Sequence, residues 1–192
     1  PPASHLARKA LTVIIRLAGQ ATSRRPPLSY HVRRHVTPAL HVQLATTSDA
    51  SSIAEMSRQL IERGLPWSWR PERVARAIAS QNTNVAVVRD EAKLVGFGII
   101  EYWDEDAHLV LFAVRPRSQR QGVGKSILAW LELCAVVAGS KRIRVEARRD
   151  NLAARGFYNE HAYHEVSLKP HMYSGAADGV LLEKWLHIPS DA

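Results

Sequence analysis

The sequence has only one cysteine among its 192 residues, which excludes an internal disulfide bond. Cys134 lies in the middle of a helical pattern, which indicates a small buried side chain rather than a reactive thiol. The chain also lacks any apolar run that approaches the ~20 residues of a membrane-spanning helix. We therefore expect no integral membrane contact.

Acidic residues are missing from the first part of the chain. Residues 1–40 contain seven Arg or Lys and no acid, and the first acid is Asp49. Without that segment, 19 basic residues remain against 18 acidic ones, so the extension contributes +7 of the net charge of +8. A nucleic-acid-binding domain carries its basic residues on the fold, so this distribution argues against nucleic acid as a partner. We divide the chain into a basic extension, residues 1–40, and one domain, residues 41–192.

The extension is open to several interpretations. Residues 6–18 have the pattern of a basic amphipathic helix, and residues 19–40 contain prolines typical of a linker. Such a segment suits a mitochondrial transit peptide, a membrane-surface helix or an arm packed on the domain. We favour a cytoplasmic enzyme with an accessory arm, whereas a transit peptide would place the enzyme in the mitochondrial matrix.

Apolar periodicity and turn residues predict an α/β domain. The expected strands are residues 42–45, 84–89, 94–103, 107–114, 142–147, 163–168 and 180–185. The expected helices are residues 49–62, capped by Asp49 and ended by Gly64, then 71–80, 121–138 and 151–160. This order predicts a mixed sheet with helices on both faces.

The most informative segment reads V-R-P-R-S-Q-R-Q-G-V-G-K-S, from Val114 to Ser126. It links an apolar strand pattern to a helical pattern through two glycines and several basic residues. Free N–H groups at a helix N-terminus, together with the helix dipole, form an anion site, and glycine lets a phosphate approach the backbone. We expect a phosphorylated ligand at residues 120–125.

Two nucleotide-binding patterns fail on spacing. A P-loop would need glycine at position 119, which is Gln119, and a dinucleotide fingerprint would need glycine at position 127, which is Ile127. The segment Q-R-Q-G-V-G resembles motif A of the GCN5-related N-acetyltransferases (GNAT), Q/R-x-x-G-x-G/A. In that family the loop holds the pyrophosphate of acetyl-coenzyme A.

A second segment, residues 143–163, is similar to motif B of the same family, N-x-x-A-x-x-F-Y. Glu146, Asn151 and Tyr158 match in type and spacing the corresponding stretch of RimI-like enzymes, which acetylate ribosomal-protein N-termini. The turn Pro66-Trp67-Ser68 matches a turn of those enzymes. The resemblance covers about residues 41–186. It implies the GNAT fold, a mixed and mostly antiparallel sheet of six to seven strands that is splayed at strands 4 and 5.

The resemblance also implies a coenzyme site. Acetyl-CoA is the expected cosubstrate, with no metal. The residues expected to contact it are Phe112, Ala113, Val114, Gln119, Arg120, Gln121, Gly122, Val123, Gly124, Lys125, Ser126, Asn151 and Tyr158. At the splay, the free backbone groups of residues 112–114 need a partner, which the pantetheine arm would supply.

Acetyl transfer to an amine needs a proton acceptor and a proton donor. Tyr158 is the expected acid for the thiolate, or else a packed aromatic residue. Glu146 is the leading base, with the alternative of a surface carboxylate paired with Arg144 or Arg148. His108 is the rival base, because an imidazole with an ordinary pKa of about 6.5 suits the task.

The acceptor is the least defined part. Trp67 and Trp69 form either an acceptor-binding wall or part of the core, and Tyr173 is a further substrate candidate. We expect an acetyl-CoA-dependent N-acetyltransferase acting on a protein N-terminus. The alternatives are a small-molecule amine acetyltransferase and a non-catalytic acyl-CoA-binding module. The oligomeric state is open between a monomer and a homodimer.

Overall fold

The computed structural model describes residues 40–173 and 177–186. The predicted basic extension, apart from Leu40, lies outside these residues. Leu40 itself packs against the hydrophobic core, at the side of the sheet that carries the glycine-containing loop.

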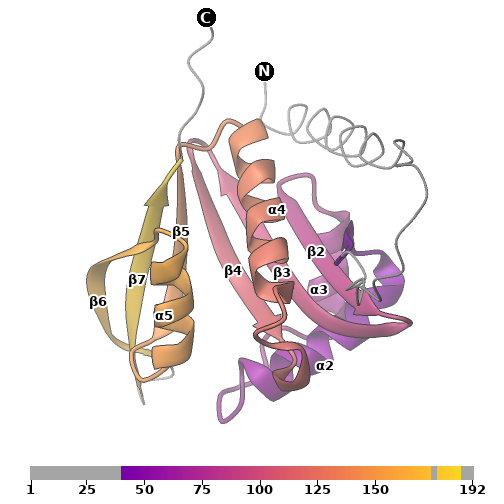
Figure 1. The fold of residues 1–192 in the computed structure, drawn as a ribbon. Helices are drawn as coiled ribbons and strands as arrows, with labels where there is room; N and C mark the ends of the chain where they lie inside the picture. The colour runs from indigo at the N-terminus through magenta and orange to yellow at the C-terminus, as the bar shows by residue number, and fades with distance from the viewer. Residues whose placement is uncertain (1–39, 174–176, 187–192) are drawn as a thin grey trace, which may run out of the picture.

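Seven strands form one sheet in the order β1-β2-β3-β4-β5-β7-β6 (Figure 1). The strands are β1 (Val42–Leu44), β2 (Thr83–Asp90), β3 (Lys93–Trp103), β4 (Asp106–Val114), β5 (Arg142–Arg148), β6 (His164–Tyr173) and β7 (Ala177–Trp185). The helices are α2 (Ala50–Leu60), α3 (Pro71–Ala79), α4 (Val123–Val137) and α5 (Leu152–Glu160), with 3-10 turns at Thr47–Asp49 and Pro116–Ser118. Every predicted element is present, and β6 and β7 extend further toward their shared turn than expected.

The predicted splay between the fourth and fifth strands is confirmed. All other neighbouring strands are antiparallel, whereas β4 and β5 are parallel and pair only from Asp106↔Arg142 to Leu109↔Val145. Beyond Leu109 the two strands separate toward the end at which α4 begins (Figure 1). The second half of β4 therefore has an edge that no strand covers.

A β-bulge lies at the start of the splay. Ile99 pairs with Leu111 and Ile100 with Leu109, so Val110 is the extra residue on β4. The extra residue shifts the alternation of side chains along β4 by one position. As a result, Leu109 lies in one core and Leu111 in the other. Phe112 and Val114 consequently face the same side as Leu109.

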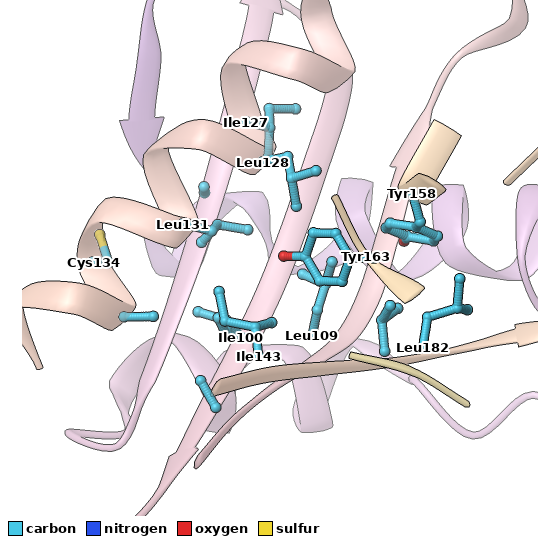
Figure 2. Packing of buried hydrophobic residues seen from close by; sticks show 14 of the residues in the cluster. Ile100, Leu109, Ile127, Leu128, Leu131, Cys134, Ile143, Tyr158, Tyr163 and Leu182 are labelled. Carbon is cyan, nitrogen blue, oxygen red and sulfur yellow. The ribbon is translucent and has the colours of Figure 1, made fainter. Parts of the chain in front are cut away.

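Two hydrophobic cores lie on the two faces of the sheet. One core joins α2 and α3 to the sheet and contains Ile53, Val74 and Phe97. The other joins α4 and α5 to the sheet, and Figure 2 shows Ile127, Leu128 and Leu131 of α4 packed toward the strands within it. Cys134 lies in this second core and burial raises its pKa to about 12, which agrees with its predicted role as a small buried side chain.

Helix α4 approaches the sheet closely because β3 carries glycine beneath it. A Cβ at Gly98 would lie 2.6 Å from Leu131 Cδ1 and 3.1 Å from Ile127 Cγ2. Contacts that short are not tolerated in a close-packed interior. Gly98 therefore sets the distance between α4 and β3, and with it the position of the loop that precedes α4.

The predicted start of α2 is confirmed, but its predicted capping contact and its predicted end were wrong. Asp49 is the N-cap residue of α2, but its carboxylate makes no capping hydrogen bond, because it accepts the Thr46 N–H at 2.8 Å in the preceding turn and pairs with Arg89. Helix α2 ends at Leu60 rather than near Glu62, although Gly64 has the predicted positive φ of 80°. The reason is tertiary: Glu62 is buried and holds the turn that follows.

Candidate functional site

The loop between β4 and α4 presents unpaired backbone N–H groups. Gly122 has φ +83° and Arg120 has φ +60°, a pair of left-handed residues that turns the chain into the helix. Within the described chain, the first helical N–H with a backbone partner is that of Ser126, which donates to the Gly122 carbonyl at 2.9 Å. The N–H groups of residues 123–125 thus lie at the positive end of α4, in the arrangement of an anion site.

The side chains of the loop divide into those that shape it and those that remain available. Gln119 Nε2 donates to the Val114 carbonyl at 3.0 Å, and Gln121 Nε2 donates to the Arg117 carbonyl at 2.9 Å. Val123 is buried in the core, so only its backbone faces the loop. Arg120 and Lys125 are exposed and form none of the ion pairs among the described residues, so their charges are available to an anion.

Aromatic side chains line the splay on the same side of the sheet. Phe112 of β4 stacks on Phe157 of α5 with ring centroids 5.5 Å apart. The Phe157 ring also lies where a Cβ on Gly124 would touch it, at 3.3 Å. The uncovered edge of residues 112–114 therefore lies next to the stacked Phe112 and Phe157 rings, while the Ala113 side chain faces the other core.

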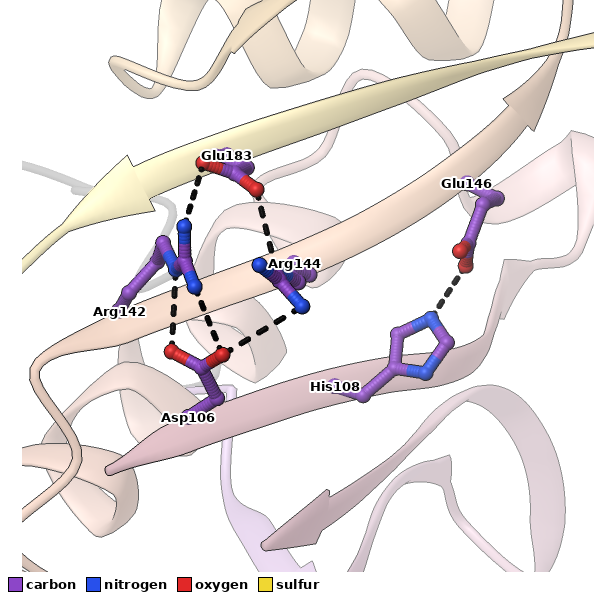
Figure 3. A network of polar contacts seen from close by, with 6 residues as sticks. All are labelled: Asp106, His108, Arg142, Arg144, Glu146 and Glu183. Atoms are coloured by element: carbon purple, nitrogen blue, oxygen red, sulfur yellow. Dashed lines mark hydrogen bonds and ion pairs between the residues drawn. The ribbon is translucent and has the colours of Figure 1, made fainter. Parts of the chain in front are cut away.

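The structure brings the two rival bases together. His108 of β4 and Glu146 of β5 are hydrogen-bonded through His108 Nε2 and Glu146 Oε2 (Figure 3). Their side chains are 18% and 21% exposed, so solvent still reaches both. Burial raises the pKa of Glu146, but the hydrogen bond and charge of His108 and the charge of Lys169 outweigh it and lower the pKa. A carboxylate only accepts, so Nε2 carries the hydrogen and Nδ1 remains as an acceptor.

The arginine partners considered for Glu146 bind other carboxylates. Arg142 donates two hydrogen bonds to Asp106, at 3.0 and 2.8 Å, and one to Glu183 at 3.1 Å. Arg144 donates to Glu183 at 3.0 Å, and Arg148 pairs with Asp150. Figure 3 shows this network next to the His108–Glu146 pair on the same face of the sheet. Sequence reasoning missed the network because its members come from three strands.

Two tyrosines among the predicted site residues have raised pKa values. Tyr158 is buried in the α4–α5 core, and its ring lies 6.2 Å from that of Phe112. Burial raises the pKa of the Tyr158 phenol well above its ordinary value, and Tyr173 adds to the rise. Burial and the charge of Glu146 raise the pKa of Tyr173. With both pKa values raised, both phenols stay protonated and able to donate.

The two tryptophans of the turn have different positions. Trp69 is buried in the α2–α3 core, and its ring lies under the Arg73 guanidinium at 4.1 Å. Trp67 lies between Arg58 and Arg70 and donates to the Trp69 carbonyl at 3.1 Å. The buried Glu62 accepts the Ser68 N–H at 2.7 Å and Ser68 Oγ at 2.6 Å, which fixes the turn. Glu62 is a positioning residue that no sequence motif indicated.

The remaining predicted site residue, Asn151, caps α5. Its side-chain oxygen accepts the Ala154 N–H at 3.1 Å, which leaves the amide nitrogen available. Within residues 40–173 and 177–186, no group of three His, Cys, Asp or Glu side chains is placed to hold a metal ion. No helix of this part of the chain is long and apolar enough to cross a membrane.

The geometry combines four chemical capacities around the splay. The N–H cradle suits an anion, the open strand edge suits an extended ligand, the His108–Glu146 pair has a free proton acceptor, and the buried phenol has a proton to donate. The cradle and the phenol lie on the α4–α5 face, whereas the pair lies on the opposite face. Two reactants that meet through the gap between the strands would each find the groups they need.

Comparisons with known proteins agree with this geometry. The sequence model of the Acetyltransferase (GNAT) family matches residues 54–163. An uncharacterized N-acetyltransferase of Methanocaldococcus jannaschii is 24% identical over 141 residues, 72% of this chain and 87% of that protein.

Solved structures share the fold. The ribosomal-protein-S18-alanine N-acetyltransferase of Escherichia coli superposes with a TM-score of 0.66 at 22% identity, over 79% of this chain and 96% of that one. A putative acetyltransferase of Salmonella typhimurium, solved with acetyl-CoA, has a TM-score of 0.66 at 19% identity, over 80% and 99% of the two chains. The expected mixed α/β fold of the GNAT type, with helices on both faces, is confirmed.

Proposed function

The chain belongs to the acetyltransferase (GNAT) family, and from this premise we propose that it transfers an acetyl group from acetyl-CoA to the α-amine of a protein N-terminus. The observation that carries the proposal is the hydrogen-bonded His108–Glu146 pair at the mouth of the splay. A non-catalytic acyl-CoA-binding module has no use for a proton acceptor at that position.

The residues present fit acetyl-CoA. The N–H groups of residues 123–125, with Arg120 and Lys125, suit a pyrophosphate, and the uncovered edge of residues 112–114 suits the amide-containing pantetheine arm. The Salmonella structure with bound acetyl-CoA supports this assignment, since the two folds superpose over most of both chains. The thioester would then lie near Phe112 and Tyr158.

The His108–Glu146 pair prepares the acceptor. A protonated amine must lose a proton before it attacks the thioester carbonyl, and we assign His108 Nδ1 as the acceptor of that proton, with Glu146 orienting the ring and stabilising the imidazolium. The lowered pKa of Glu146 makes that carboxylate a weaker base than an imidazole. This proposal reverses the order of the two candidates expected from the sequence.

Tyr158 serves the leaving group. As the N–C bond forms and the C–S bond breaks, the sulfur gains negative charge, and we assign the Tyr158 phenol as the donor of a proton to it. The raised pKa keeps that proton on the phenol until the thiolate appears. The nitrogen, which bears a second proton after its attack, gives that proton up to the Tyr158 phenolate as the amide forms, and the proton accepted at His108 returns to solvent through the partly exposed pair.

A protein N-terminus is the acceptor that this chemistry favours. A terminal α-amine has a pKa near 8 and a lysine amine about 10.4, so a partly exposed imidazole suffices for the former. The Escherichia coli relative, a ribosomal-protein-S18-alanine N-acetyltransferase, supports a protein acceptor.

The test is thiol release from acetyl-CoA with three acceptors: peptides with free N-termini, the same peptides with blocked N-termini and an internal lysine, and small amines. Release only with free N-termini, and mass increase at the N-terminal residue, supports the proposal. Turnover of small amines alone would assign the protein to small-molecule acetylation. Coenzyme binding without turnover of any amine would identify a binding module.

A further inference from the structure

A second concave site lies beside the His108–Glu146 pair. It is an open groove of about 360 Å³ between α3 and the ends of β2 and β3. Its lining includes Trp69, Arg73 and Arg76 on the side of α3, and Glu101 and Trp103 of β3. The lining residues that come from α3 recur at helical spacing. One face of α3 therefore forms the wall of the groove, and the sheet forms its floor.

The floor of the groove continues into the proposed reaction site. Glu101 of β3 is the direct cross-strand partner of His108 of β4, so the two side chains share a face of the sheet. The Trp103 ring meets the His108 ring edge-on at 5.5 Å between centroids. From groove to site, the order across the sheet is Glu101, His108 and Glu146. A chain lying in the groove would therefore present its end to His108.

The wall of the groove carries positive charge that the described residues leave unpaired. None of the ion pairs between described residues involves Arg73 or Arg76, and both side chains are exposed. The Arg73 guanidinium stacks on the Trp69 ring at 4.1 Å. Stacking fixes the plane of a guanidinium and leaves the N–H groups at its edge free for a carboxylate.

We propose that this groove binds the first residues of the acceptor polypeptide, and that Arg73 and Arg76 select acceptors with an acidic side chain just after the reactive N-terminus. The inference rests on the proposed function and adds a substrate class to it. Glu101, on the floor, attracts the protonated α-amine toward His108, while the two arginines bind the carboxylate. The groove is open along its length, which suits a chain that continues into solvent rather than an enclosed small molecule.

The experiment compares three peptides that share the first residue and the length and differ in residues 2–4, which are Glu, Gln or Lys. The value of kcat/KM should be roughly tenfold higher for the Glu peptide than for the Gln peptide, as one charge-assisted contact allows, and lowest for the Lys peptide. The preference should weaken as salt rises. Arg73→Gln and Arg76→Gln should each reduce the preference, and Arg76→Glu should turn it toward the Lys peptide.

Lys93→Gln is the matched control, because Lys93 is an exposed cation at the opposite end of β3 from Trp103. This variant removes the same charge and should keep the full preference for the Glu peptide. Thermal unfolding of each variant shows that the substitutions, all on exposed side chains, leave the fold intact. If Lys93→Gln lowers the preference for the Glu peptide as much as Arg76→Gln does, the preference comes from net charge. That result would overturn the proposed role of the groove.

The experiment distinguishes failure of the proposed arginine selection from failure of the proposed function. Efficient acetylation of all three peptides at equal rates would overturn the arginine selection and leave the proposed function standing. If no peptide is acetylated, the proposed function fails. The groove is then tested by binding of the three peptides to the protein with coenzyme A, with tryptophan fluorescence as the signal. Binding in the order Glu, Gln, Lys then supports the groove, and equal binding overturns it.

Discussion

His108 and Glu146 are hydrogen-bonded where β4 and β5 separate, one residue before the last strand pair on β4 and one residue after it on β5. If the two side chains act as one proton-accepting unit, removing either should cost about as much as removing both. We expect His108→Asn and Glu146→Gln each to lower kcat/KM by about 10²–10³-fold at pH 7. The double variant should be little worse, and each loss should shrink as pH rises, because the α-amine then deprotonates unaided.

Steady-state kinetics of the three variants between pH 6 and pH 9 measure this coupling. Losses that multiply in the double variant would show two independent roles. If Glu146→Gln cripples turnover and His108→Asn does not, the carboxylate itself is the base.

The Asp106 network makes stability depend on pH in a defined direction. Hydrogen bonds from Arg142 lower the pKa of Asp106, so its stabilising contribution is present above the unfolded value near 3.9 and is lost as pH falls through the lower folded value. Asp106→Asn should cost about 1–2 kcal/mol in the free energy of unfolding at pH 7. Urea unfolding at pH 3 should show a smaller difference in the free energy of unfolding between this variant and the parent. Asp104→Asn, in the exposed turn nearby, should stay within about 0.5 kcal/mol at both pH values.

Gly122 tests the anion loop. Gly122→Glu places a negative charge and a side chain at the N–H cradle and should weaken coenzyme A binding by about 100-fold, the equivalent of one or two charge-assisted hydrogen bonds. Gly139→Glu is the control, because Gly139 has nearly the same backbone angle, φ +85°, at the other end of α4. Calorimetry should show normal coenzyme A affinity for that variant. Equal affinities in both folded variants would place the coenzyme elsewhere.

Tyr158→Phe removes only the phenol oxygen. Coenzyme A binding should survive, while turnover falls by about 10²–10⁴-fold for the loss of a general acid. Tyr102→Phe is a matched control, since it removes a buried phenol that donates to Asn84 at 2.6 Å, away from the splay. That change should lower stability by about 1 kcal/mol and leave turnover intact. Unchanged turnover in Tyr158→Phe would assign the proton donor to Tyr173 or to water.

Gly98 and Gly156 should respond to alanine with opposite signs. Gly98→Ala drives a Cβ into Leu131 and Ile127 and should destabilise the protein by about 1–3 kcal/mol. Gly156 lies within α5, and a Cβ added there would meet no atom within 4 Å beyond its chain neighbours and the backbone of its own helix. Gly156→Ala should therefore raise the free energy of unfolding by about 0.5–1 kcal/mol. Denaturant unfolding of the two variants checks both. Stabilisation by Gly98→Ala would show that α4 does not need its close approach to β3.

Local patterns in the sequence were sufficient to predict the helices and strands and the turn before α4. Alternation in β5 separated Val145 and Ala147 from Glu146, and the glycines before α4 marked a turn whose geometry depends on adjacent residues. Helix ends were less predictable. The end of α2 depends on the buried Glu62 carboxylate, which binds the Ser68 N–H six residues away, and no short pattern records that contact.

The helices and strands, the glycine-containing loop before α4 and the acid and base candidates could be predicted from the sequence, because each depends on spacing within one segment. How the candidates combine could not, because that depends on the packing of separate elements. His108 and Glu146 are 38 residues apart, and the parallel pairing of β4 with β5 is what turns two rival bases into one hydrogen-bonded pair. The groove beside them likewise exists only because α3 packs across β2 and β3, which places Arg73 and Arg76 opposite Glu101. Periodicity predicts which face a side chain takes, but which neighbour it meets there is set by packing between elements.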